Sequence, residues 1–115
     1  METNEDVLNI VYNKNDSIIY ETDENGIVTI LEIQNHKIQR FFRKIGFKIP
    51  EYRKTELDEY SSYVFLLIDG VNSIEKIGEL LENHFGEKIQ PLYERLLLFL
   101  NHIDTNCGYI YKLEN

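Results

Sequence analysis

The chain has a single cysteine, Cys107, among its 115 residues, and this scarcity excludes two kinds of stabilisation. An intramolecular disulfide needs two cysteines, and a zinc site built on thiolates needs several. The three histidines, His36, His84 and His102, are scattered and lack the short spacing that metal ligands show. We therefore expect neither a metal nor a cofactor in this chain.

Long apolar runs are also missing. No stretch reaches the length of about eighteen apolar residues that a transmembrane helix requires. The N-terminal sequence METNEDVLNI has neither the basic nor the apolar region of a signal peptide. We expect a cytoplasmic protein that does not bind membranes, with a polar segment over residues 1–16 that frays and a single domain over residues 17–115.

Positive charge is scarce overall but concentrated in one window. The net charge of -8 disfavours non-specific binding to nucleic acid. Residues 37–54 carry a net charge of +6, and the rest of the chain carries -14. This segregation predicts an electrostatic patch and not solubility alone. The basic residues of the window are Lys37, Arg40, Arg43, Lys44, Lys48, Arg53 and Lys54.

Three strands are predicted in the first half of the chain. Two β-prone runs, at about 17–22 and 27–33, flank the turn sequence DENG, and Asn-Gly between such runs is a strong hairpin signal. The run from Tyr52 to Leu57 alternates without strong apolar commitment, which is typical of an edge strand. Between the second and third strands, residues 35–46 have the apolar spacing of a short amphipathic helix with a basic outer face.

Three helices are predicted in the second half, at about 58–70, 73–86 and 91–105, each with start and stop signals. Asp58 and Ser73 are suited to be the N-caps of the first two. The predicted fold class is therefore α+β, with a three-stranded antiparallel sheet followed by a three-helix bundle and one extra helix inserted between strands two and three.

Two leucines of the last helix do not fit its apolar stripe. Leu97 and Leu98 lie about 120–140° from the centre of that stripe on a helical wheel. Either they make a second tertiary contact, or they form an apolar groove wall for a partner. Both interpretations stay open from the sequence.

Motifs for catalysis are missing. The sequence contains no Gly-rich phosphate loop and no nucleophile elbow. Cys107 is interpreted as a small, partly buried residue and not as a nucleophile. We therefore predict no catalytic residues and expect a binding protein instead of an enzyme.

One family resemblance extends over about residues 17–111. The stretch LDEYSSYVFLLIDGVNSIEKIGELLENHFG, followed by a helix that ends in FLNHIDTNCGYI, resembles the PqqD-like proteins, the RiPP recognition elements. In that family a Leu-Asx-Glu step leads into a helix that stops at an aliphatic-Asp-Gly turn, and a Ser/Thr-capped helix follows. The order and spacing of these motifs are more specific than any one of them.

The resemblance implies a winged helix-turn-helix-like domain that acts as a peptide chaperone in natural product biosynthesis. In the family, the leader of a ribosomally synthesised, post-translationally modified peptide binds as an added strand against the third strand and the last helix. Here these elements correspond to Tyr52–Leu57 and Leu92–Ile103, and Leu57 itself is expected in the core. The expected peptide-binding residues are Tyr52, Arg53, Lys54, Thr55, Glu56, Tyr93, Leu97 and Leu98.

The resemblance also implies two partners, a precursor peptide and a separate modifying enzyme. The basic window favours an acidic leader. The enzyme class most often implied is a radical S-adenosylmethionine maturase of the SPASM type, with a leader peptidase or cyclase as the second class, and any cofactor belongs to that enzyme. The segment 35–46 is absent from the shortest family members, and its role stays open.

Two other functions remain as alternatives. The order of helices also suits a winged-helix DNA-binding regulator, although few basic residues lie on the helix pair that would contact DNA. The exposed leucines and the edge strand also suit a structural subunit of an obligate dimer. The sequence does not distinguish a monomer from a homodimer.

Overall fold

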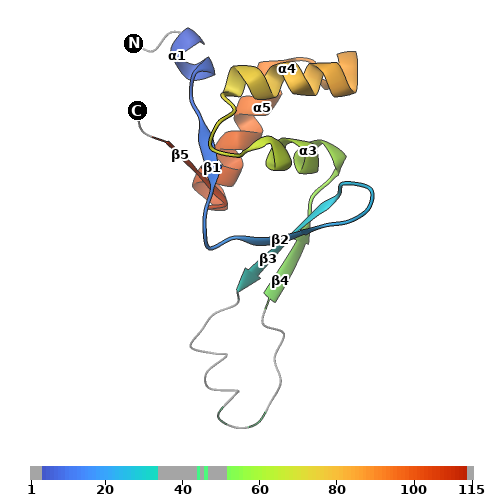
Figure 1. Ribbon diagram of the computed structural model, residues 1–115, viewed down its shortest axis with the longest axis vertical. Helices are drawn as coiled ribbons and strands as arrows, with labels where there is room; N and C mark the ends of the chain where they lie inside the picture. The colour runs from blue at the N-terminus through green and yellow to red at the C-terminus, as the bar shows by residue number, and fades with distance from the viewer. Residues whose placement is uncertain (1–3, 34–43, 45, 47–51, 114–115) are drawn as a thin grey trace.

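The computed structural model describes residues 4–33, 44, 46 and 52–113 (Figure 1). This part of the chain is α+β, as predicted, with one three-stranded and one two-stranded antiparallel sheet and about four helices. The predicted inserted helix at 35–46 lies outside the described residues, apart from Lys44 and Gly46.

The larger sheet contains the predicted hairpin and the predicted third strand. Its strands are β2 (Ile19–Thr22), β3 (Val28–Ile33) and β4 (Tyr52–Glu56), in the order β2-β3-β4. The turn between β2 and β3 is held by Asp23, whose carboxylate accepts hydrogen bonds from two amides of the turn, at 2.8 and 3.0 Å. Gly26 adopts a φ of +82°, a left-handed conformation that favours glycine.

The three predicted helices are present, and their bounds are α3 (Glu59–Leu67), α4 (Ile74–Phe85) and α5 (Leu92–Asn101). A 3-10 turn at Gly86–Ile89 joins α4 to α5, and a π-helical turn at His102–Asn106 extends α5.

Both predicted N-caps are confirmed. The Asp58 carboxylate accepts a hydrogen bond of 2.8 Å from the Ser61 amide, and the Ser73 hydroxyl accepts one of 3.2 Å from the Lys76 amide. These bonds satisfy amides that have no partner within the first turn of a helix.

The Asp-Gly step after α3 explains why the helix stops abruptly. The Asp69 carboxylate accepts hydrogen bonds from the amides of Asn72 and Val71, at 2.8 and 2.9 Å, and these bonds lower the pKa of Asp69. Gly70 has a φ of +80° and donates its amide to the carbonyl of Tyr12. The turn that ends α3 is therefore also connected to the N-terminal part of the chain by a backbone hydrogen bond.

The N-terminal segment contributes two elements that the sequence analysis did not include. Asn4–Leu8 forms α1, and β1 (Tyr12–Lys14) pairs with β5 (Ile110–Lys112) in the two-stranded sheet. Tyr12 is 5 % exposed. The Lys14 ammonium donates to the Ile68 carbonyl, and burial lowers the pKa of this lysine. The strand β1 is therefore packed against the helices and paired with β5.

The hydrophobic core lies between the larger sheet and the helices. Val28 and Ile30 are fully buried on one face of β3 and belong to the same core cluster as Val64 and Phe65 of α3. Leu57, which was expected in the core, is half-buried and packs against it. None of the described helices is long and apolar enough to cross a membrane. The other fully buried or nearly buried core residues include Val64, Phe65, Ile68, Ile74, Ile77, Leu81, Leu96, Leu100 and Ile103.

Candidate functional site

The strand β4 lies at an edge of the larger sheet, and β3 is its only strand partner within the described ranges. The Leu57 amide donates a hydrogen bond of 2.8 Å to the Val28 carbonyl, so these two residues are a hydrogen-bonded pair of the antiparallel ladder. Because hydrogen-bonded pairs alternate in an antiparallel ladder, the backbone N–H and C=O groups of Lys54 and Glu56 are directed away from β3. These groups can pair with an added strand.

The side chains of β4 alternate between the two faces of the sheet. Lys54 lies opposite Leu31 and is exposed. Arg53 lies opposite Glu32 on the other face and is also exposed. The positive charges predicted beside the docking edge are therefore at the surface of β4. Lys44 is exposed as well, whereas the other predicted patch residues, Lys37, Arg40, Arg43 and Lys48, lie outside the described residues.

Thr55 belongs to a polar contact that ties β4 to the end of the chain. The Tyr109 hydroxyl donates a hydrogen bond of 2.5 Å to the Glu32 carboxylate and also contacts the Thr55 side chain. Burial, followed by the effect of Glu32, raises the pKa of Tyr109 to about 12. The Tyr109 hydroxyl therefore holds the two strands to the segment after α5.

An exposed row of α5 lies beside the first turn of α3, the helix that follows β4, and the sequence identified one residue of this row. Arg95, Leu98 and His102 have the spacing i, i+3, i+7, so their side chains form one row. The Arg95 guanidinium lies 5.1 Å above the ring of Tyr60, which follows β4 in the chain. Leu98 is 72 % exposed. The helical spacing of Arg95 and His102 with Leu98 is the signal in the sequence that could have identified these two residues.

Cys107 links this row to β4. Its thiol lies 3.5 Å from Nε2 of His102, and Arg53 is close enough to influence it electrostatically. Burial nevertheless raises the pKa of the Cys107 thiol, which opposes a role as a nucleophile. Within the described ranges, no group of three or more His, Cys, Asp or Glu side chains is arranged to hold a metal ion.

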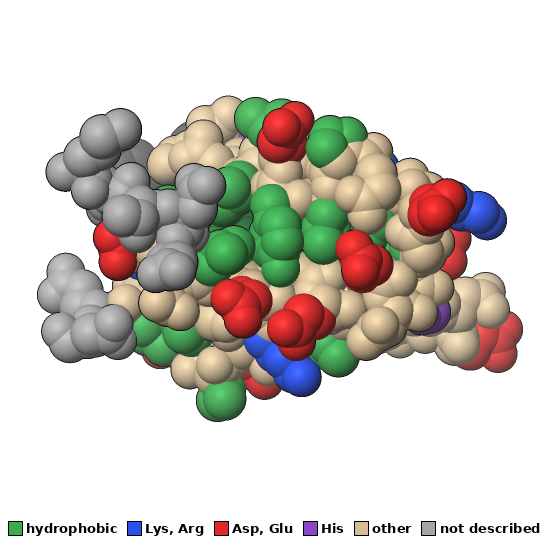
Figure 2. Space-filling model, turned by 90° about the horizontal axis from the view of Figure 1, so that it is seen from above, with side chains coloured by type: hydrophobic (Ala, Val, Ile, Leu, Met, Phe, Trp, Pro, Cys, Tyr) green, Lys and Arg blue, Asp and Glu red, His purple; other side chains and the backbone are tan. Residues whose placement is uncertain are grey.

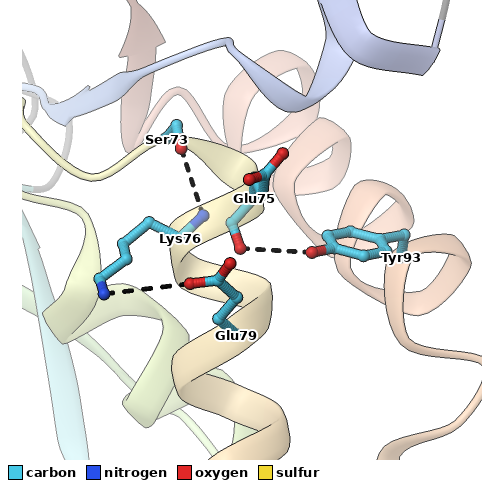
Figure 3. Close-up of polar contacts among 5 residues, drawn as sticks. All are labelled: Ser73, Glu75, Lys76, Glu79 and Tyr93. Atoms are coloured by element: carbon cyan, nitrogen blue, oxygen red, sulfur yellow. Dashed lines mark hydrogen bonds and ion pairs between the residues drawn. The ribbon is translucent and has the colours of Figure 1, made fainter.

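Leu97 and Tyr93 belong to a different surface. Leu97 is half-buried and lines a pocket of about 380 Å³ together with residues of α1. Tyr93 lies beside it, and its hydroxyl donates to the Glu75 carbonyl at 3.2 Å (Figure 3). In Figure 1, α1 lies at the top of the view and β4 lies below the helices. Arg53 and Lys54 are thus exposed on opposite faces of β4, and Leu98 is exposed on α5. Leu97 and Tyr93 line the pocket beside α1 instead.

No family model, curated protein or solved structure matches this chain. The resemblance to the PqqD-like proteins therefore stays a prediction from the sequence.

Proposed function

We propose that this chain is a noncatalytic recognition protein of the PqqD-like, winged helix-turn-helix-like type. It binds the leader of a ribosomally synthesised precursor peptide along β4 by strand addition and presents that peptide to a separate modifying enzyme. The observation that carries the proposal is the open edge of β4, where the backbone groups of Lys54 and Glu56 face away from β3. An edge of this kind is the recognition element of β-augmentation.

The backbone alone is not sufficient for useful affinity. Three or four hydrogen bonds of about 1 kcal/mol each supply roughly 3–4 kcal/mol, whereas micromolar binding requires about 8 kcal/mol. Two apolar side chains buried on binding supply on the order of 3–6 kcal/mol. Leu98, which is 72 % exposed, and the half-buried Phe99 beside it offer the apolar surface for such anchors.

The charges around the edge favour an acidic leader. Arg53 and Lys54 on β4 are exposed, and Arg95 is exposed on α5 beside the ring of Tyr60. Such cations increase the association rate of an acidic peptide and disfavour a basic one. In the absence of a peptide, charged side chains on an edge strand also oppose aggregation.

The alternative of a DNA-binding regulator is not favoured by the surface of α4. Glu75, Glu79 and Glu82 are exposed at the spacing i, i+4, i+7, so they form an acidic row along this helix. A row of carboxylates repels the phosphate backbone of duplex DNA. We therefore give priority to the peptide-recognition proposal.

The proposal is tested by calorimetric titration of the full chain with synthetic leader peptides encoded by small reading frames beside its gene. Wild-type protein is expected to bind one of them at micromolar or tighter concentration. Lys54→Pro removes an outward N–H without removing a bond to β3, and we expect at least tenfold weaker binding. Lys54→Gln removes only the charge and is the matched control, with a loss of about fivefold or less. Equal affinities for Lys54→Pro and Lys54→Gln would exclude strand addition at this edge.

A further inference from the structure

A second apolar surface lies between α1 and α5. Its pocket of about 380 Å³ is lined by Val7, Leu8, Tyr93, Glu94 and Leu97. We call these five residues the α1–α5 groove. Val7, Leu8 and Leu97 are half-buried and pack against the core, so the groove has an apolar floor that remains open to solvent.

The rim of the α1–α5 groove is acidic. Glu94 lines it directly. Burial raises the pKa of Tyr93, and the charges of Glu75, Glu79 and Glu82 raise it further, which places the acidic row of α4 beside this ring. Figure 2 shows the same end of the molecule from above as a band of hydrophobic side chains with Asp and Glu side chains on both sides.

One cation of α4 pairs with a carboxylate of the acidic row. Lys76 on α4 forms an ion pair of 3.9 Å with Glu79, and both side chains are more than half exposed (Figure 3). A surface ion pair of this kind leaves most of the field of the neighbouring carboxylates in place. The groove therefore combines an open apolar floor with a negative potential.

We propose that the α1–α5 groove is a docking site for a basic amphipathic segment of a partner protein. An apolar side chain of that segment enters the pocket between Leu8 and Leu97, and its Lys or Arg side chains lie over Glu79 and Glu94. Charge complementarity selects this occupant, because an acidic segment would bring like charges together at the rim.

This docking site is distinct from the proposed leader site. The edge of β4 carries Arg53 and Lys54 and favours an acidic strand, whereas the α1–α5 groove favours a basic segment. The two surfaces use different residues of α5, namely Leu98 for the first and Leu97 for the second. The chain can therefore hold an acidic peptide and a basic partner at the same time, and the groove proposal does not depend on leader binding.

The test uses a synthetic fifteen-residue peptide of leucine and lysine, with leucines at the spacing i, i+3, i+4, i+7, and a second peptide in which glutamate replaces lysine. Fluorescence anisotropy measures binding to the full chain, and amide chemical shifts locate the site. We expect the lysine peptide to bind and to shift the amides of Leu8, Tyr93 and Leu97. We expect the glutamate peptide not to bind.

Charge-reversal variants distinguish the groove from general attraction to an acidic protein. The double variant Glu79→Lys with Glu94→Lys is expected to weaken binding of the lysine peptide by at least tenfold, since each reversal of a surface charge is worth about fivefold. The matched control is Glu21→Lys with Glu24→Lys, which changes the net charge equally in the exposed β2 hairpin. No binding of the lysine peptide, equal weakening by both double variants, or shifts confined to other elements would overturn the proposal.

Discussion

The Ser62 hydroxyl accepts a hydrogen bond of 2.9 Å from the Val28 amide and thereby caps the end of the β3–β4 ladder. The same hydroxyl donates to the Leu57 carbonyl at 3.3 Å. Ser62 belongs to α3 and is 1 % exposed. One buried side chain therefore satisfies the backbone where β4 ends and joins α3 to the sheet.

Replacing Ser62 by alanine leaves the buried Val28 amide without this partner. We expect Ser62→Ala to lower the free energy of unfolding by about 1–3 kcal/mol, as for other unsatisfied buried donors. Urea denaturation followed by circular dichroism measures the change. Ser61→Ala, one residue away, is the control and is expected to change stability by less than about 0.5 kcal/mol. Similar stabilities of the two variants would show that the ladder does not need this cap.

Gly78 in α4 makes room for the ring of Tyr93. A Cβ atom at Gly78 would lie 2.5 Å from Cε1 of Tyr93 and 2.7 Å from its hydroxyl oxygen. Replacing glycine by alanine inside a helix normally stabilises the helix by about 1 kcal/mol. Here the overlap with a rigid ring makes the same replacement destabilising. We expect Gly78→Ala to destabilise the protein by about 1–3 kcal/mol in thermal or urea unfolding.

A second substitution isolates the cause of the Gly78 effect. In a Tyr93→Ala background the overlapping ring is gone, so Gly78→Ala is expected to become neutral or stabilising there. The double-mutant cycle therefore gives a large coupling energy between the two positions. Additive effects of the two substitutions would contradict the close packing of α4 on α5 at this point.

Tyr109 makes stability depend on pH in the alkaline range. The pKa of this tyrosine is raised from 10.0 to about 12 in the folded protein, by burial and by Glu32. Between these values the folded state keeps a proton that the unfolded state releases, so the free energy of unfolding falls as pH rises. The contribution is fully present below pH 10, and we expect a loss of up to about 2 kcal/mol by pH 12.

Comparing wild type with Tyr109→Phe separates the effect of Tyr109 on the pH dependence of stability from the effects of the other tyrosines. The variant lacks the hydrogen bond to Glu32, so it is expected to be less stable than wild type at pH 8. The difference should shrink between pH 10 and 12, as measured by urea unfolding at a series of pH values. Tyr111→Phe, at a side chain that is 40 % exposed, is the control and should follow the wild-type curve. A constant difference over this range would contradict the assigned pKa.

Local signals in the sequence were sufficient for most of the elements. The turn at Asp23 and Gly26, and the caps Asp58 and Ser73, act within a few residues, and each is confirmed by a hydrogen bond or a backbone angle. The N-terminal elements were not predicted. The strand β1 has only three residues and pairs with β5 almost a hundred residues later, so neither periodicity nor a turn signal reveals it.

The candidate site was predictable in part, because some of its features also follow from local patterns in the sequence. Alternation in the sequence identified β4 as an edge strand, and the helical wheel separated Leu97 and Leu98 from the core stripe. The wheel does not show what packs on each side of α5. Leu97 is half-buried and lines a pocket together with Val7 and Leu8 of α1, and α1 is an element without a sequence signal. Leu98 stays exposed beside Arg95 and His102.

Leu98 offers the sharpest test of which side of α5 binds the leader. Because this side chain is 72 % exposed, Leu98→Asp is expected to leave the free energy of unfolding within about 0.5 kcal/mol of wild type. The substitution should weaken the binding of an acidic leader by at least tenfold, since it removes an apolar anchor and adds a repelling charge. Val71→Asp, at a 77 % exposed position in the turn after α3, makes the same chemical change outside both surfaces and should bind normally. Equal affinities of the two variants would show that the leader does not contact this face of α5. Recognition would then depend on the edge of β4 alone.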